Sequence, residues 1–139
     1  MSDLPLGIFD SGLGGLSVWR ELIQKLPQES VIYVADQARC PYGPRSEDEI
    51  RRFSHEIVQF LLRKKCKLII LACNTATAAA IKSLRDSYDI PFVGMEPALK
   101  PAIQQTKSGH IGILATEGTF RGNHFKETKA KFASNVEVH

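Results

Sequence analysis

The sequence predicts an α/β fold in which helices cover a parallel sheet. Short apolar runs alternate along the chain with longer segments whose apolar residues recur at helical spacing. The run at residues 68–72 is almost wholly apolar, which is typical of a strand with both faces covered. Because this alternation implies right-handed crossovers, the carboxyl ends of the strands should gather at one edge of the sheet.

The first part of the chain supplies three strand–helix pairs. Pro27 ends the first helical pattern, and Ser46 with Glu49 forms a capping box that begins the second. Between them, residues 36–44 carry two prolines and a glycine, which predicts a loop. The strands are predicted at residues 6–9, 31–35 and 68–72, and the helices at 16–26, 46–61 and 75–88.

The same alternation continues toward the end of the sequence. A short strand is predicted at residues 91–94, followed by a helix at 98–106 and a strand at 111–114. A last helix should begin near Thr119. The pattern contains neither an internal repeat nor a low-complexity linker.

The glycines of Gly12-Leu13-Gly14-Gly15 invite comparison with a dinucleotide-binding turn, with Asp36 in the place of the ribose-binding acid. However, Ser17 stands where the third glycine belongs, and Asp10 would repel a pyrophosphate. A tight turn between strand and helix is the simpler interpretation.

Composition indicates one core in a protein of the cytoplasm. The chain has 139 residues, of which 43% are hydrophobic and 24% charged, so two complete domains are not expected. The net charge of +3 is spread out, and the basic run at 63–65 reads as a solvated helix end rather than a nucleic-acid surface. Neither a leader sequence nor an apolar stretch long enough to span a membrane is found.

The cysteines and histidines do not predict a metal site. Cys40, Cys66 and Cys73 are an odd set without a C-x-x-C pair, so free thiols are expected, with Cys66 structural. His55 should be solvated on the outer side of its helix. The remaining histidines share no spacing typical of metal ligands; they are His110, His124 and His139.

Polar residues cluster where the predicted strands end. Parallel α/β sheets bind ligands outside these ends, so the side chains should converge on a pocket for a small zwitterion. Asp10 would accept an ammonium group, and helix N-termini would hold a carboxylate. Helix capping is the alternative explanation for each residue taken singly. The residues are Asp10, Ser11, Tyr42, Gly43, Cys73, Asn74, Thr75, Thr116 and Thr119.

Cys73 is the most informative of these residues. It lies between an apolar strand and the helix that begins with Asn74-Thr75-Ala76. Unpaired N–H groups and the positive end of the helix dipole stabilise a thiolate relative to a thiol, so Cys73 could act as a base or a nucleophile. A buried structural cysteine is the alternative.

Three motifs in this order resemble those of glutamate racemases in the cofactor-independent aspartate/glutamate racemase superfamily. They are Asp10-Ser11-Gly12-Leu13-Gly14-Gly15, the segment from Tyr33 to Gly43, and Ala72-Cys73-Asn74-Thr75-Ala76. The resemblance implies interconversion of L- and D-glutamate without pyridoxal phosphate or metal, which supplies D-glutamate for peptidoglycan. The resemblance also implies that Cys73 is a catalytic residue.

The resemblance also assigns substrate contacts and a two-domain fold. The contacting positions are Asp10, Ser11, Tyr42, Gly43, Asn74 and Thr75, with Thr116 and Thr119 in a segment that approaches the substrate. Residues 1–95 would form a three-layer first α/β domain without its C-terminal return, and residues 96–139 the incomplete start of a second, similar domain. Relatives carry a second catalytic cysteine farther along, so we expect an N-terminal fragment that is inactive alone.

Two expectations concern partners. The resemblance implies a homodimer at full length, with L- or D-glutamate as the small-molecule substrate. The alternative is a non-catalytic module, derived from a racemase, that binds a small molecule or another protein. Cys40 lies in the predicted loop at 36–44 and is the less favoured candidate for a second base.

Overall fold

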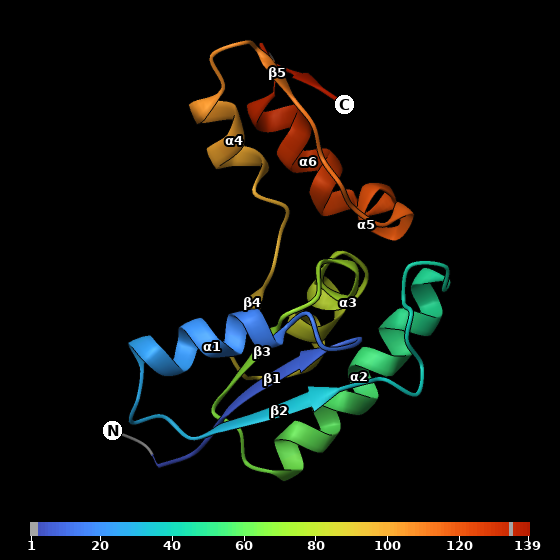
Figure 1. Cartoon of the computed structure of the whole chain (residues 1–139). Coiled ribbons are helices and arrows are strands. Elements are labelled where there is room, and N and C mark those ends of the chain that lie inside the picture. Colours follow the sequence, from blue (N-terminus) through green and yellow to red (C-terminus); the bar gives the residue numbers. More distant parts are fainter. Residues whose placement is uncertain (1–2, 134) are drawn as a thin grey trace.

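A four-stranded parallel sheet with strand order β2-β1-β3-β4 organises the first part of the chain. We describe a computed structural model, which covers residues 3–133 and 135–139 (Figure 1). The predicted alternation of strands and helices is confirmed. The elements are β1 (Leu6–Asp10), α1 (Leu16–Lys25), β2 (Val31–Ala35), α2 (Glu47–Arg63), β3 (Leu68–Leu71), α3 (Asn74–Ser87) and β4 (Phe92–Gly94).

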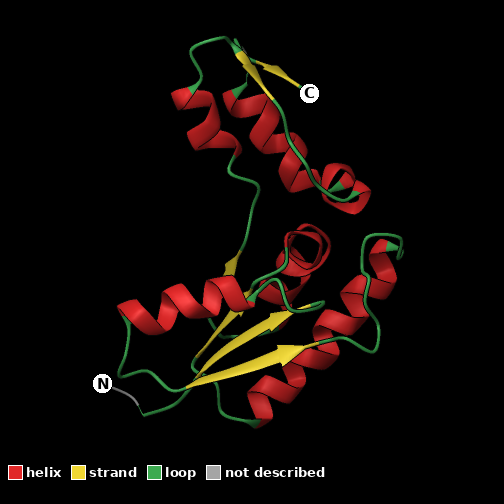
Figure 2. Cartoon of the chain, in the orientation of Figure 1, coloured by secondary structure: helices red, strands yellow, loops and turns green. Residues whose placement is uncertain are grey.

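The strand order explains how the helices cover the sheet. The chain moves from β1 to β2 on one side, and then crosses back past β1 to form β3 and β4 on the other. Right-handed crossovers therefore put α1 on one face and both α2 and α3 on the opposite face. Figure 2 shows α1 and α2 on opposite sides of the strands. The result is the three-layer arrangement that the sequence predicts.

The hydrophobic core lies mainly between the sheet and the pair α2–α3. Side chains from the sheet and from both helices are completely buried, among them Phe9, Val58, Leu61, Leu71 and Leu84. In contrast, α1 contains no fully buried residue, and Leu16 and Leu26 at its two ends are 40% and 45% exposed. The face of the sheet that carries α1 is therefore the less densely covered one.

The capping box of α2 is present as predicted. The hydroxyl of Ser46 accepts a hydrogen bond from the backbone N–H of Glu49, and the Glu49 carboxylate accepts one from the backbone N–H of Ser46. Two N–H groups that have no partner within the helix are thereby satisfied.

A second, smaller part of the chain follows β4. Its two strands, β5 and β6, pair in parallel and form a separate sheet. Figure 1 shows this part above the four-stranded sheet, joined to it by the segment after β4. Its elements are α4 (Leu99–Gln105), β5 (His110–Ile111), α5 (Glu117–Arg121), α6 (Asn123–Phe132) and β6 (Glu137–Val138).

In this second part, one predicted strand has the wrong bounds, and the predicted last helix is present but divided. The strand expected at 111–114 is only His110–Ile111, and Leu114 is fully exposed. The helix expected near Thr119 begins at Glu117 and is divided at Gly122. A Cβ atom on Gly122 would lie 2.8 Å from the Cβ of Ala78, so the glycine allows the chain to pass close to α3.

The prediction that His55 is solvated is wrong. Its Nδ1 lies 3.1 Å from the hydroxyl of Tyr88, and its Nε2 lies 3.2 Å from the hydroxyl of Ser83. Burial, and then the charge of Arg51, lower the pKa of His55 below its ordinary value. The imidazole therefore links α2 to α3 and its C-terminal cap.

The cysteines agree with the prediction of free thiols. Cys66 is buried in the core, and burial raises the pKa of its thiol, which fits a structural role. Across the ranges 3–133 and 135–139, no helix has the length and apolar character needed to cross a bilayer.

Candidate active site

The candidate site lies where β1 and β3 run side by side. The connection after β1 leads to one side of the sheet and the connection after β3 leads to the other, so a crevice opens between their carboxyl ends. Ser11 follows β1 and Cys73 follows β3, and the Ser11 Oγ lies 3.6 Å from the Cys73 Sγ. Two residues 62 positions apart in the sequence are thus brought into contact, as the sequence predicts.

Cys73 is fixed at the N-terminus of α3. It is the N-cap residue, and its Sγ accepts a hydrogen bond from the backbone N–H of Ala76 at 3.4 Å. The side chain is only 8% exposed, yet it lines a cavity. Cys73 is therefore both a helix cap and part of the cavity wall, and the helix dipole favours negative charge there.

Asp10 closes the turn after β1. One carboxylate oxygen accepts a hydrogen bond from the backbone N–H of Gly15 at 2.8 Å, and the other accepts one from the backbone N–H of Ser11 at 2.7 Å. The carboxylate is buried and also lines the cavity. Asp10 therefore stabilises the turn before α1, while the helix itself has no side-chain cap at its N-cap residue Gly15.

Gly15 allows this turn to pack closely. A Cβ atom at this position would lie 2.8 Å from the Ala72 Cβ, 2.8 Å from the Tyr33 hydroxyl and 3.0 Å from the Asp10 Cβ. Gly15→Ala is expected to lower the free energy of unfolding by about 1–3 kcal/mol, since these neighbours have to move. Chemical denaturation measures the loss. Gly112→Ala is the matched control because no atom lies within 4 Å of its Cβ position, and equal losses in both variants would contradict the steric argument.

Tyr33 adjoins the site, although no role was predicted for it beyond its place in the second motif. Its hydroxyl donates a hydrogen bond to the Gly12 carbonyl oxygen at 3.3 Å. Burial raises the pKa of Tyr33 to about 12, and the charges of Asp10 and Cys73 add to the shift. Its position in β2 could have indicated this proximity, because Tyr33 pairs with Ile8 of β1, two residues before Asp10.

The raised pKa of Tyr33 predicts a loss of stability in alkali. An unfolded tyrosine ionises near pH 10, whereas the folded one keeps its proton to about pH 12. Stability that is present below pH 10 is therefore lost as the pH rises from 10 toward 12. Tyr33→Phe should make this decline shallower, as measured by urea unfolding between pH 9 and 11. The same slope in both proteins would rule out this contribution.

Tyr42 belongs to the loop at 36–44, and its side chain is buried, at 2% exposure. Its hydroxyl donates a hydrogen bond to the buried carboxylate of Asp36, which also accepts from the Arg39 Nε at 3.0 and 2.7 Å. The Tyr42 ring packs against Phe53 of α2, with 5.8 Å between centroids. Burial, followed by the hydrogen bond to Asp36, raises the pKa of Tyr42 well above its ordinary value.

Gly43 and the threonines connect the two parts of the chain. A Cβ on Gly43 would lie 3.3 Å from the Thr116 Cγ2. The Thr116 Oγ1 lies 2.8 Å from the Thr75 Oγ1 and 3.1 Å from the Thr119 Oγ1, and the Thr75 and Thr119 oxygens are 3.5 Å apart. We call these three residues the threonine cluster. It joins the N-terminus of α3 to the N-terminus of α5.

An open cavity of ≈ 680 Å³ separates the two parts of the chain beside Cys73. Its size suits a small ligand. Six of the nine candidate residues line it: Asp10, Cys73, Asn74, Thr75, Thr116 and Thr119. Ser11 is not part of the wall but contacts the Cys73 thiol. Tyr42 and Gly43 are not part of the wall either, and lie in the loop at 36–44.

Known proteins resemble this chain over nearly all of its length. The sequence profile of the family described as Asp/Glu/Hydantoin racemase matches residues 11–138. A glutamate racemase from Herpetosiphon aurantiacus is 51% identical over 138 residues, which is 99% of this chain and 54% of the relative. One from Pseudomonas paraeruginosa is also 51% identical, over 96% of this chain and 51% of the relative.

Solved structures give the same result. Escherichia coli glutamate racemase, in complex with L-glutamate and the activator UDP-MurNAc-Ala, has a TM-score of 0.89 at 39% identity, over 97% of this chain and 52% of that one. Glutamate racemase from Francisella tularensis, in complex with D-glutamate, has a TM-score of 0.82 at 33% identity, over 100% and 52%. The chain spans about half the length of these relatives.

The profile match covers all of the candidate residues except Asp10, which immediately precedes it. The parallel α/β fold and the convergence of strand ends on Cys73 agree with that match. On these grounds the chain belongs to the Asp/Glu/Hydantoin racemase family.

Proposed function

We propose that this chain forms one half of the active site of an enzyme that interconverts L- and D-glutamate. The observation that carries the proposal is the position of Cys73, whose thiol lines the cavity at the N-terminus of α3 and contacts Ser11. The names of the relatives support glutamate as the substrate, and two similar structures hold L- or D-glutamate.

In the proposed mechanism, Cys73 serves one face of the substrate. Racemisation takes the α-proton from one side of the carbon and returns a proton to the other, so two groups must flank it. The Cys73 thiolate accepts the proton from one enantiomer, and its thiol returns a proton when the reaction runs the other way. Cys73 is the only thiol in the described part of the cavity wall. We therefore propose that the second catalytic cysteine, which the family resemblance places farther along the complete protein, serves the other face.

Donors around the cavity would hold the substrate carboxylate and stabilise the carbanion that develops. The hydroxyls of the threonine cluster, together with the N-terminus of α3, supply such donors. The carboxylate of Asp10 would accept the ammonium group.

We further propose that residues 1–95 and 96–139 belong to two domains that enclose this cavity. In the complete enzyme, two copies would form a homodimer. The product D-glutamate would serve the synthesis of peptidoglycan.

Exchange of the α-proton tests the proposed function. The chain, and a form extended to the length of its relatives, would be incubated with L-glutamate in deuterated water and followed by proton NMR and chiral analysis. Deuterium incorporation and D-glutamate are expected with the extended form only. Turnover by the short chain would place a second base within it, and an inert extended form would overturn the proposal.

A second candidate function is binding of glutamate without catalysis. It is favoured by one observation: Cys73 caps α3, a structural role that needs no reactivity. Titration of the isotope-labelled chain with L- and D-glutamate would test it. Shifted amide resonances of Thr75 and Thr116, with no exchange in the extended form, would support this candidate over the racemase.

A further inference from the structure

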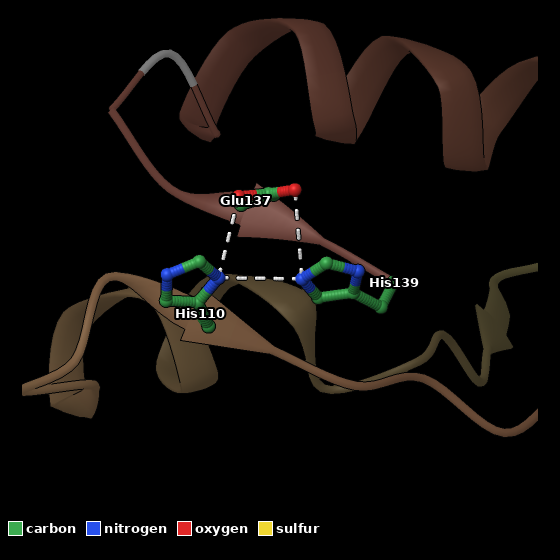
Figure 3. Close-up of side chains that lie close together, drawn as sticks. All are labelled: His110, Glu137 and His139. Carbon is green, nitrogen blue, oxygen red and sulfur yellow. Dashed lines mark hydrogen bonds and ion pairs between the residues drawn. The ribbon is translucent and has the colours of Figure 1, made fainter.

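Three side chains meet on one face of the small sheet. His110 of β5 pairs with Glu137 of β6 in the parallel register, and His139 follows Glu137 by two positions. Because side chains alternate along a strand, all three project from the same face. Figure 3 shows the two imidazoles and the carboxylate turned toward one another. The spacing of the histidines in the sequence does not indicate this grouping, because it depends on the pairing of β5 with β6.

The distances between their donor atoms fit a bound cation. The His110 Nδ1 lies 3.3 Å from the His139 Nε2 and 3.3 Å from the Glu137 Oε2, and the His139 Nε2 lies 3.7 Å from the Glu137 Oε1. Bonds of about 2.0–2.2 Å in a tetrahedral arrangement separate neighbouring ligand atoms by about 3.4 Å. A cation would therefore fit between the three groups with little change in the strands.

The backbone already holds the three residues in register. The N–H of His139 donates to the Ile111 carbonyl at 2.9 Å, and the N–H of Glu137 donates to the Gly109 carbonyl at 2.8 Å. On the other strand, the Thr106 hydroxyl donates to the His110 carbonyl at 3.0 Å. A site on a hydrogen-bonded ladder needs less ordering when a ligand binds.

The ligand set selects the class of metal. Two imidazoles and one carboxylate suit Zn²⁺ and similar transition metals, whereas Mg²⁺ and Ca²⁺ prefer oxygen ligands alone. The three residues are exposed, so water can complete the coordination. They are absent from the wall of the Cys73 cavity, and Figure 1 shows β5 at the end of the second part that lies away from the four-stranded sheet.

We propose that His110, Glu137 and His139 bind one Zn²⁺ ion, which clips β5 to β6. A two-stranded sheet is marginally stable by itself, so a shared metal ion would strengthen the pairing. The same three groups also form an imidazole–imidazole hydrogen bond and ion pairs without a metal, which is the competing explanation.

Calorimetric titration of the whole chain with Zn²⁺ tests the proposal. One ion per chain is expected, and His110→Ala, His139→Ala and Glu137→Gln should each weaken binding at least about tenfold. His55→Gln is the matched control, since His55 contacts Tyr88 and Ser83 instead, and it should bind within about twofold of the parent. Mg²⁺ should give no comparable binding.

A second readout separates this site from the thiols. The imidazole resonances of His110 and His139 should shift together on addition of one equivalent of Zn²⁺. Unchanged affinity in His110→Ala, or loss of binding in Cys40→Ser but not in the histidine variants, would overturn the proposal. Because the three ligands are exposed, their replacement should leave the far-UV circular dichroism of the chain unchanged.

Discussion

Cys73→Ser is expected to abolish measurable racemisation in a form extended to the length of the relatives. A serine hydroxyl is a far weaker acid than a thiol, so little alkoxide exists to accept the α-proton. Loss of a positioned acid/base group lowers the turnover number by about 10²- to 10⁴-fold. Serine is nearly isosteric and a good N-cap residue, so it should still accept the hydrogen bond from Ala76. The rate of deuterium exchange into L-glutamate measures the effect.

Cys40→Ser is the matched control for this variant. Cys40 is exposed, and it is not part of the cavity wall beside Cys73. The control should therefore keep its turnover within about twofold of the parent. A large loss in Cys40→Ser would make that thiol the second base, while full activity in Cys73→Ser would return Cys73 to a structural role.

Asp36→Asn is expected to give the largest loss of stability. The buried carboxylate accepts hydrogen bonds from the Tyr42 hydroxyl and from the Arg39 Nε. An amide offers one oxygen in place of two and carries no charge to pair with the guanidinium. Removing one partner of such a buried network costs about 2–4 kcal/mol. Urea denaturation measures the difference in the free energy of unfolding.

Two further variants make this second prediction specific. Asp89→Asn changes an exposed carboxylate and should stay within about 0.5 kcal/mol of the parent. Tyr42→Phe removes only the hydroxyl, so combining it with Asp36→Asn completes a double-mutant cycle. A coupling energy near zero would contradict the hydrogen bond between the two side chains.

The sequence predicts the first part of the fold closely. Apolar runs of four or five residues mark β1, β2 and β3, and the capping box of Ser46 and Glu49 marks the start of α2. Local patterns suffice there because several strands and a helix pair bury a common core. Local patterns fail for β5. The apolar run extends to Leu114, but the partner strand β6 is only Glu137–Val138, so β5 is limited to His110–Ile111.

Side-chain contacts at the ends of parallel strands can be predicted from the sequence. Contacts that depend on how neighbouring helices or strands pack cannot. The contact of Ser11 with Cys73 follows from the parallel sheet. In contrast, the partners of His55 are Ser83 on the neighbouring helix and Tyr88 just beyond it, and no pattern within α2 reveals them. The meeting of His110 and His139 depends in the same way on pairing between strands separated by two helices.

The threonine cluster has a consequence for how an anion would enter. Three hydroxyls carry three hydrogens, and three oxygen–oxygen links join them, so a closed ring uses every hydrogen once. The link between Thr75 and Thr119, at 3.5 Å, is the longest. An arriving carboxylate oxygen would need to break only that link to gain a donor, while the shorter link between Thr75 and Thr116 kept the ends of α3 and α5 together. The anion would then be bound by rotation of one hydroxyl group, without a movement of the backbone.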